Sequence, residues 1–170
     1  MPLLLQMMRA KVDISFARSM DIRLPSSSIC CPGDAVRLFP RNALTWPGER
    51  MLLVLLDEQG VVLLREWIAA GTEGTLAYDT GLVARRLSET GAAWFLLVHN
   101  HPGGNPAFSK TDVEGVREVL LRPPPLLFRF LDFLAVAPGG TPGSPPRFTS
   151  LRFGQAGNGM GFARAPFYSA

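Results

Sequence analysis

Long apolar runs separated by short polar segments predict a sheet in this chain. Residues 49–68 hold two apolar runs joined by the segment "DEQG", a composition that predicts a β-hairpin with a four-residue connection. The run 51–56 is apolar without alternation, as is the run 93–98, so we expect two strands that are covered on both faces. A partly alternating run over 126–137 predicts a further strand, and 147–153 a last short one.

Helical spacing and capping residues predict helices between these strands. The first covers roughly 35–45, with Asp34 as its cap and Pro40 making it short or irregular. The second runs from about 79 to 89 with one apolar face, and the third begins at Ser109. Helices and strands in this order indicate one α+β fold of the layered α/β type.

The ends of the chain carry less pattern than its middle. Residues 1–28 are expected to form a flexible or lightly docked leader, because their apolar run is far short of the roughly 20 residues that span a membrane. The Gly-rich tail 155–170 is expected to be mobile. A chain of 170 residues that is 47% hydrophobic suits one core, which we place in residues 29–154.

Charge and cysteine content narrow the class of protein. The net charge of +3 comes from arginines spread along the chain, whereas nucleic-acid binding normally requires a basic patch. The only two cysteines, Cys30 and Cys31, are adjacent, which is poor geometry for a disulfide bridge. We therefore expect a cytoplasmic protein without nucleic-acid or membrane partners, whose oligomeric state the sequence leaves open.

The segment "VHNHPGGNPAFSKTD", residues 98–112, carries the candidate chemistry. In extended chain His99 and His101 point to the same side, so both imidazoles can bind one ion. Asp112 lies in the first turn of a helix whose N-terminus faces the loop after His101. Two imidazole nitrogens, one carboxylate and an open position for water are the ligands of a catalytic zinc ion.

A simpler interpretation exists for Ser109 and Asp112. A serine followed three residues later by an acid caps a helix and stabilises it by about 1 kcal/mol without any metal. The two roles are compatible. The chain has only two histidines and both fall in this motif, which favours a metal site over a polar loop.

The string "HNHPGGNPAFSKTD" resembles the metal-binding signature of the JAMM, or MPN+ (JAB), metalloproteases, and "VHNHPGG" is most similar to their RadC-like JAB branch. The resemblance covers roughly residues 29–154. It implies the MPN/JAB fold, a cytidine-deaminase-like mixed β-sheet flanked by helices. It also implies that His99, His101 and Asp112 bind one Zn²⁺, that Ser109 stabilises the oxyanion, and that Glu49 is the general acid/base.

Glu49 is a reasonable acid/base on physical grounds as well. It stands directly before six apolar residues of the first buried strand, where partial desolvation of a carboxyl group suits proton transfer. The alternative is a charge at a strand end that reaches solvent. The resemblance favours the catalytic interpretation.

Three departures from similar chains limit what the resemblance implies. Many RadC-like chains carry an Asp-His pair in the late strand, where this chain has Asp132 and Phe133. The first 30 residues are too short and too unpatterned for the helix-hairpin-helix region that often precedes the domain. The helix containing "YDTGLVARRLSETG" lacks the usual arginine near its start, which leaves substrate contacts there undefined.

The leading hypothesis is a zinc-dependent metalloprotease that hydrolyses a peptide or isopeptide bond. The substrate class is a protein or peptide, for example a conjugate of a ubiquitin-like modifier. Two alternatives stay open. One is a catalytically silent JAB-fold interaction domain, and the other is a RadC-type protein associated with DNA repair, which the missing basic patch makes the weakest of the three.

Overall fold

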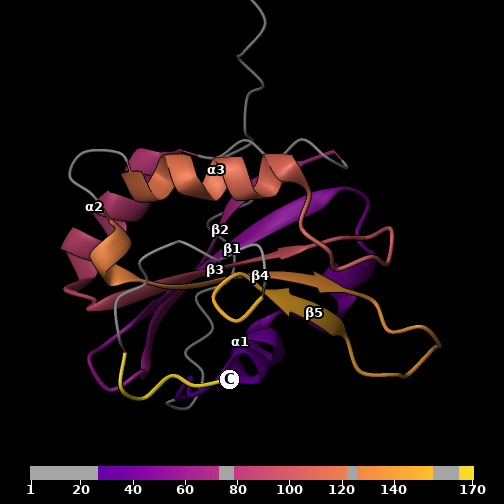
Figure 1. Ribbon diagram of the computed structural model, residues 1–170, viewed down its shortest axis with the longest axis horizontal. Coiled ribbons are helices and arrows are strands. Elements are labelled where there is room, and N and C mark those ends of the chain that lie inside the picture. The colour runs from indigo at the N-terminus through magenta and orange to yellow at the C-terminus, as the bar shows by residue number, and fades with distance from the viewer. Residues whose placement is uncertain (1–26, 73–78, 122–125, 155–164) are drawn as a thin grey trace, which may run out of the picture.

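The computed structural model describes residues 27–72, 79–121, 126–154 and 165–170. Within these ranges the chain forms a sheet, three α-helices and two short 3-10 helices (Figure 1). The elements in chain order are α1 (Pro32–Leu38), a 3-10 helix (Arg41–Thr45), β1 (Glu49–Leu56), β2 (Val62–Gly71), α2 (Thr80–Thr90), β3 (Trp94–Asn100), α3 (Lys110–Leu121), a 3-10 helix (Leu127–Arg129), β4 (Phe130–Ala137) and β5 (Arg147–Ser150).

One five-stranded sheet organises the fold. Its strand order is β2-β1-β3-β4-β5, with β3 and β4 parallel and the other neighbours antiparallel. The parallel pair needs a crossover, and α3 supplies it. This arrangement confirms the predicted α+β class and the mixed sheet flanked by helices.

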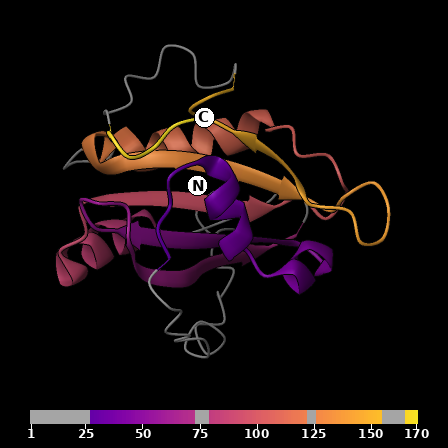
Figure 2. The ribbon, with the colours of Figure 1, turned by 90° about the horizontal axis from the view of Figure 1, so that it is seen from below.

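Helices cover both faces of the sheet. In Figure 1, α2 and α3 lie on one face and α1 on the other; Figure 2 views the molecule from the α1 side. Consecutive strand residues alternate between two apolar clusters: Leu52 and Leu96 belong to the cluster on the α1 face, whereas Leu53 and Leu97 belong to the cluster under α2 and α3. Strands β1 and β3 are therefore buried on both faces, as their continuous apolar runs predict.

The predicted hairpin is confirmed as β1 and β2. Its turn is held by the Asp57 carboxylate, which accepts hydrogen bonds from the backbone N–H of Gln59 (2.9 Å) and of Val61 (2.8 Å). Strand β2 begins one residue later than a four-residue connection would give, since Val61 forms an isolated bridge with Ser28 instead.

The predicted helix over 35–45 is wrong in its length and its cap. Helix α1 spans Pro32–Leu38 and a separate 3-10 helix follows Pro40, because proline has no N–H to continue an α-helix. Asp34 lies inside the helix rather than before it. Its carboxylate accepts hydrogen bonds from the N–H groups of Cys30 (2.9 Å) and Cys31 (3.1 Å). Asp34 therefore caps the helix from a position inside its first turn.

The remaining element predictions are correct within a few residues, except that residues 126–129 were expected in a strand and instead lead into β4 through the 3-10 helix Leu127–Arg129. Helix α2 runs one residue later than predicted, and α3 begins directly after Ser109 as expected. Strand β5 ends at Ser150 instead of 153, because a turn follows. None of the helices in the described residues is both long and apolar enough to cross a membrane.

The expectation of a mobile tail over 155–170 is wrong for its last residues. Ala165 and Tyr168 are buried in the cluster on the α1 face, and the Tyr168 hydroxyl donates to the carboxylate of Asp132 (2.8 Å). The backbone N–H of Ser169 also donates to the carbonyl of Cys30 (2.9 Å). A buried aromatic ring with a satisfied hydroxyl anchors this segment. Residues 155–164, and residues 1–26 of the predicted leader, lie outside the described part of the chain.

Candidate metal centre

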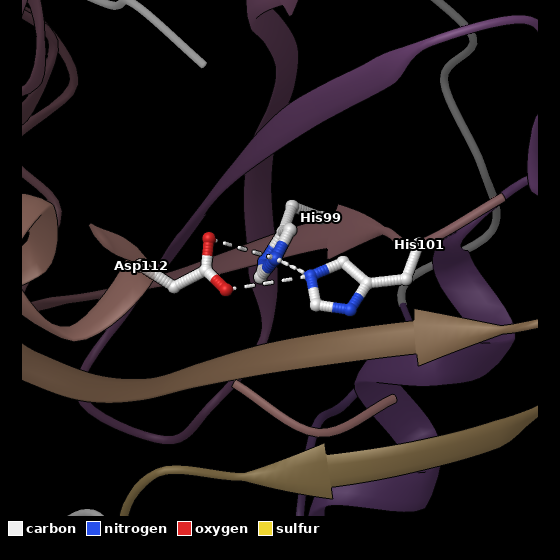
Figure 3. A group of neighbouring side chains, drawn as sticks. All are labelled: His99, His101 and Asp112. Carbon is white, nitrogen blue, oxygen red and sulfur yellow. Dashed lines mark hydrogen bonds and ion pairs between the residues drawn. The ribbon is translucent and has the colours of Figure 1, made fainter. Parts of the chain in front are cut away.

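Three predicted ligands come together where β3 meets the start of α3. His99 is the penultimate residue of β3, His101 follows the strand, and Asp112 lies in the first turn of α3. Strand alternation directs both imidazoles to the face covered by α3, and the side chains point at one another in Figure 3. The predicted grouping of these residues is therefore present.

The distances among these side chains suit a single metal ion. One ligand atom from each residue lies within 4.8 Å of the others. The Asp112 oxygens lie 3.6 Å from His99 Nε2 and 3.5 Å from His101 Nε2, and the two Nε2 atoms are 2.5 Å apart. Zinc ligands at about 2.0–2.1 Å in tetrahedral geometry stand about 3.3 Å apart. The two distances from the Asp112 oxygens to the Nε2 atoms are close to that value. Moving the two imidazole rings slightly apart brings the distance between their Nε2 atoms to it as well.

The hydrogen bonding of His101 leaves the required nitrogen available. Its Nδ1 lies 2.8 Å from the carbonyl oxygen of Asn105. A carbonyl only accepts, so Nδ1 carries the proton and Nε2 of the neutral ring carries a lone pair. A backbone carbonyl behind a metal-binding imidazole fixes the tautomer and the ring orientation in this way.

His99 is held as a neutral ring. Its side chain is fully buried, and its Nδ1 has no aligned hydrogen bond within the described residues. Burial, followed by the positive charge of His101, lowers the pKa of His99 to about 3. The neutral imidazole is the form that binds metals.

Asp112 and His101 form a charged pair around the same point. Burial opposes the charge of Asp112, but hydrogen bonds from His101 and Ser109 and the electrostatic interaction with the adjacent His99 ring keep its pKa well below the ordinary value. Burial likewise opposes the charge of His101, but the Asp112 hydrogen bond, the Asn105 carbonyl and the charges of Asp112 and Glu49 raise its pKa. In the metal-free protein, the proton of His101 supplies the positive charge beside the Asp112 carboxylate. A bound cation would replace that proton, so these side chains suit a divalent metal.

The structure places Ser109 in a capping box with Asp112. The backbone N–H and the hydroxyl of Ser109 both lie 2.7 Å from Asp112 Oδ2, and the Asp112 N–H donates back to the hydroxyl oxygen (3.1 Å). The capping interpretation is therefore correct. The predicted oxyanion role of Ser109 stays a prediction, since its single hydroxyl proton is directed at Asp112 here.

Glu49 lies at the start of β1, on the same face as the histidines. In the β1–β3 ladder Met51 pairs with His99, and Glu49 lies two residues before Met51, so strand alternation places its side chain on the same face of the sheet as the imidazoles. Glu49 is only 5% exposed, which contradicts the alternative of a strand-end charge in solvent. Its charge also contributes to the raised pKa of His101. Its acid/base role stays a prediction.

Sequence reasoning gave no role to two residues beside the ligands. Phe133 of β4 stacks on the ring of His99, with centroids 4.7 Å apart. Asn100, between the two histidines, is fully buried and binds the backbone on both sides of Glu49. The alternation of side chains along a strand indicates that Asn100 points to the opposite face of the sheet from the histidines. Its hydrogen-bond partners are distant in sequence, so no sequence pattern indicates them.

Comparison with known proteins finds one family model and several relatives that this chain resembles. The family model of the RadC-like JAB domain matches residues 29–143. A UPF0758 protein of Caldanaerobacter subterraneus subsp. tengcongensis is 24% identical over 132 residues, which cover 78% of this chain and 57% of that protein. A UPF0758 protein of Desulforamulus reducens is 33% identical over 85 residues, covering 50% of this chain and 37% of that protein. This chain therefore spans about half the length of these relatives.

Proposed function

This chain belongs to the RadC-like JAB domain family, and from that premise we propose that it is a zinc-dependent hydrolase of peptide or isopeptide bonds. The convergence of His99, His101 and Asp112 carries the proposal. Three ligands of these types leave one coordination position for solvent or substrate, which distinguishes a catalytic zinc site from a structural site with four protein ligands.

His99 Nε2, His101 Nε2 and one Asp112 oxygen would hold the ion. A zinc ion bound there would polarise a carbonyl group and lower the pKa of water to about 7. The protein contributes the fixed orientation of these ligands. The Asn105 carbonyl orients His101, the aromatic neighbours hold His99, and the capping box holds Asp112.

Glu49 would move the proton during hydrolysis. As general base its carboxylate takes a proton from the attacking water, and as general acid it returns that proton to the leaving nitrogen when the C–N bond breaks. Its burial supports this role, because a carboxylate shielded from bulk water exchanges protons with the reacting groups rather than with solvent.

Ser109 can contribute to catalysis without releasing Asp112. Both the N–H and the hydroxyl of Ser109 bind the same carboxylate oxygen. The hydroxyl can therefore rotate and donate to an oxyanion that develops on the substrate while the N–H keeps Asp112 in place. A donor aimed at developing charge is the usual source of transition-state stabilisation in amide hydrolysis.

The substrate that we propose is a protein or peptide with an accessible amide bond. Family membership supports this class, and the bond after the C-terminal tail of a ubiquitin-like modifier is the specific case to test first. The location that we propose is the cytoplasm, on the basis of the unpaired adjacent cysteines Cys30 and Cys31.

The experiment compares zinc-loaded wild type with Glu49→Gln on a panel of peptides, linear ubiquitin-like fusions and isopeptide-linked conjugates. We expect the wild type to cleave at least one member, and Glu49→Gln to keep about one zinc per chain while losing cleavage by about a hundredfold or more. Glu118→Gln, an exposed change on α3, is the matched control and should cleave normally. Equal cleavage by Glu49→Gln would refute the assignment of the base, and absence of cleavage by every zinc-loaded form would favour a silent interaction domain.

A further inference from the structure

We infer that Asn100 is a positioning residue that fixes Glu49 relative to the two histidines. The inference rests on the proposed role of Glu49. Asn100 lies between His99 and His101 in sequence, but its side chain points to the opposite face of the sheet by strand alternation. It therefore does not act as a metal ligand, and its contacts explain what it does.

The side chain of Asn100 forms three hydrogen bonds inside the protein. Its Nδ2 donates to the carbonyl of Ala43 (3.1 Å) and to the carbonyl of Gly48 (3.3 Å). Its Oδ1 accepts from the backbone N–H of Arg50 (2.7 Å). Both amide protons and the acceptor are used, as expected for a fully buried polar side chain.

These bonds hold the backbone on both sides of Glu49. Gly48 directly precedes Glu49 and Arg50 directly follows it, so one amide group binds the residue before and the residue after the proposed acid/base. The bond to Ala43 adds the 3-10 helix that leads into β1. Because Asn100 is covalently joined to His99 and His101, the same residue sets the position of Glu49 against both imidazoles.

The ladder between β1 and β3 does not reach Glu49. Its last pair is Met51 with His99, two residues short of Glu49, whose backbone pairs only with Gly71 of β2 in the sheet. Gly48 has φ +82°, and a Cβ there would collide with the Gly71 carbonyl, so the chain turns sharply just before β1. The Asn100 side chain therefore adds a direct attachment between β3 and the start of β1, beyond the last pair of that ladder.

The chemistry of the contact requires an asparagine. Two carbonyls need two donors and one N–H needs an acceptor, which a primary amide supplies from one planar group. Aspartate offers no donor when ionised, and serine offers one hydroxyl proton on a shorter side chain. A leucine has the same branching at Cγ without any polar atom and is somewhat bulkier, so Asn100→Leu removes the hydrogen bonds while still filling the site; the smaller Asn100→Ser checks that bulk alone does not cause the effect.

The test uses the cobalt(II)-loaded protein, whose visible spectrum reports ionisation at the metal as the pH is varied. We compare wild type, Glu49→Gln, Asn100→Leu, Asn100→Ser and the double variant Glu49→Gln/Asn100→Leu. Removing the negative charge of Glu49 eases the loss of a proton at the metal, so Glu49→Gln should lower the spectral midpoint by about one pH unit. Asn100→Leu should lower it in the same direction, and the double variant should go no further than Glu49→Gln alone.

A matched control separates positioning from general destabilisation. Ser150→Ala removes a buried hydrogen bond to Asp132 (2.7 Å), on the sheet face opposite the histidines. It should lower the free energy of unfolding and leave the spectral midpoint unchanged. Bound cobalt at one per chain shows that each variant is folded at the site. If both Asn100 variants fail to bind cobalt, Asn100 supports the histidines rather than Glu49 and the inference is wrong.

The proposed role of Glu49 and the inferred role of Asn100 are contradicted by different results. An unchanged midpoint in Glu49→Gln would contradict the proposed role of Glu49 and the inference with it. Two results would overturn the inference about Asn100 alone. One is a shifted spectral midpoint in Glu49→Gln with no shift in Asn100→Leu and Asn100→Ser. The other is a shift in the double variant that equals the sum of the two single shifts.

Discussion

The phenyl ring of Phe133 is stacked on the imidazole of His99, with ring centroids 4.7 Å apart and an angle of 17° between their planes. Phe108 stacks on the same phenyl ring at 5.1 Å and lies 6.2 Å from the His99 ring, so the buried ligand packs in a cluster with two phenylalanine rings. The orientation of His99 therefore depends on packing at this side, where Nδ1 lacks an aligned partner.

Phe133→Leu should weaken zinc binding by about tenfold, because an aliphatic side chain no longer fixes the plane of the His99 ring. The free energy of unfolding of the metal-free protein should fall by about 1 kcal/mol. Competition with a zinc chelator measures the affinity. Phe130→Leu is the control, since Phe130 is also fully buried but packs on Phe95. Equal zinc affinity in the two variants would contradict an orienting role for Phe133.

Ser109→Ala should lower the free energy of unfolding by about 1 kcal/mol, because the α3 start loses its side-chain cap. Zinc affinity should also decrease, since Asp112 keeps only the backbone N–H of its two bonds from Ser109. Denaturant titration and chelator competition measure the two effects. Ser109→Thr keeps the hydroxyl and should recover both; a threonine variant as weak as the alanine variant would argue against the capping box.

The metal-free protein should lose stability as the pH falls from 6.5 toward about 4. The unfolded chain protonates His99 at its ordinary pKa of 6.5, but burial lowers the folded pKa to about 3, so the unfolded state binds more protons in this window. His101, whose folded pKa is raised, contributes stability that is already complete below pH 6.5 and does not offset the loss. The stabilising contribution of Asp112, whose folded pKa is lowered, is lost only as the pH falls below its ordinary value of 3.8.

Urea titrations of metal-free protein at several pH values between 7 and 4 check this dependence. His99→Gln removes the titrating ring and should show a flatter profile over the same range. A wild-type profile as flat as that of His99→Gln would mean that His99 is not buried as a neutral ring in solution.

Tyr168→Phe should lower the free energy of unfolding by about 1–3 kcal/mol, because the buried carboxylate of Asp132 loses one hydrogen bond. Zinc content should not change, since Tyr168 packs on the α1 face, away from the ligands. Thermal or urea unfolding measures the difference. Ser169→Ala, an exposed neighbour, should behave as wild type. A Tyr168→Phe variant as stable as wild type would show that this segment is not docked in solution.

The sequence was sufficient for features that depend on nearby residues. Apolar runs and the "DEQG" turn predicted β1 and β2, since a hairpin is a local structure. The spacing of His99 and His101 predicted two imidazoles on one side, because strand alternation has a fixed period. Asp112 was also predicted, since Ser109 marks the helix start.

Features that depend on distant contacts were missed. The sequence predicts a mobile tail at Tyr168 because the partner of this side chain, Asp132, lies 36 residues away. The role of Asn100 was likewise missed, because its partners are 50 to 57 residues earlier in the chain. Helix α1 was misplaced for a local reason: Asp34 caps from within the first turn, so an acidic residue alone does not fix the helix start.

The most direct test of the central claim is the zinc content of the purified protein, measured by mass spectrometry after dialysis against zinc and then against metal-free buffer. Wild type should retain about one zinc per chain, and His99→Ala and Asp112→Ala should retain none, whereas Glu118→Ala on the exposed side of α3 should retain it. Zinc-free wild type, or an Asp112→Ala variant that retains the full equivalent, would contradict a metal centre built from His99, His101 and Asp112.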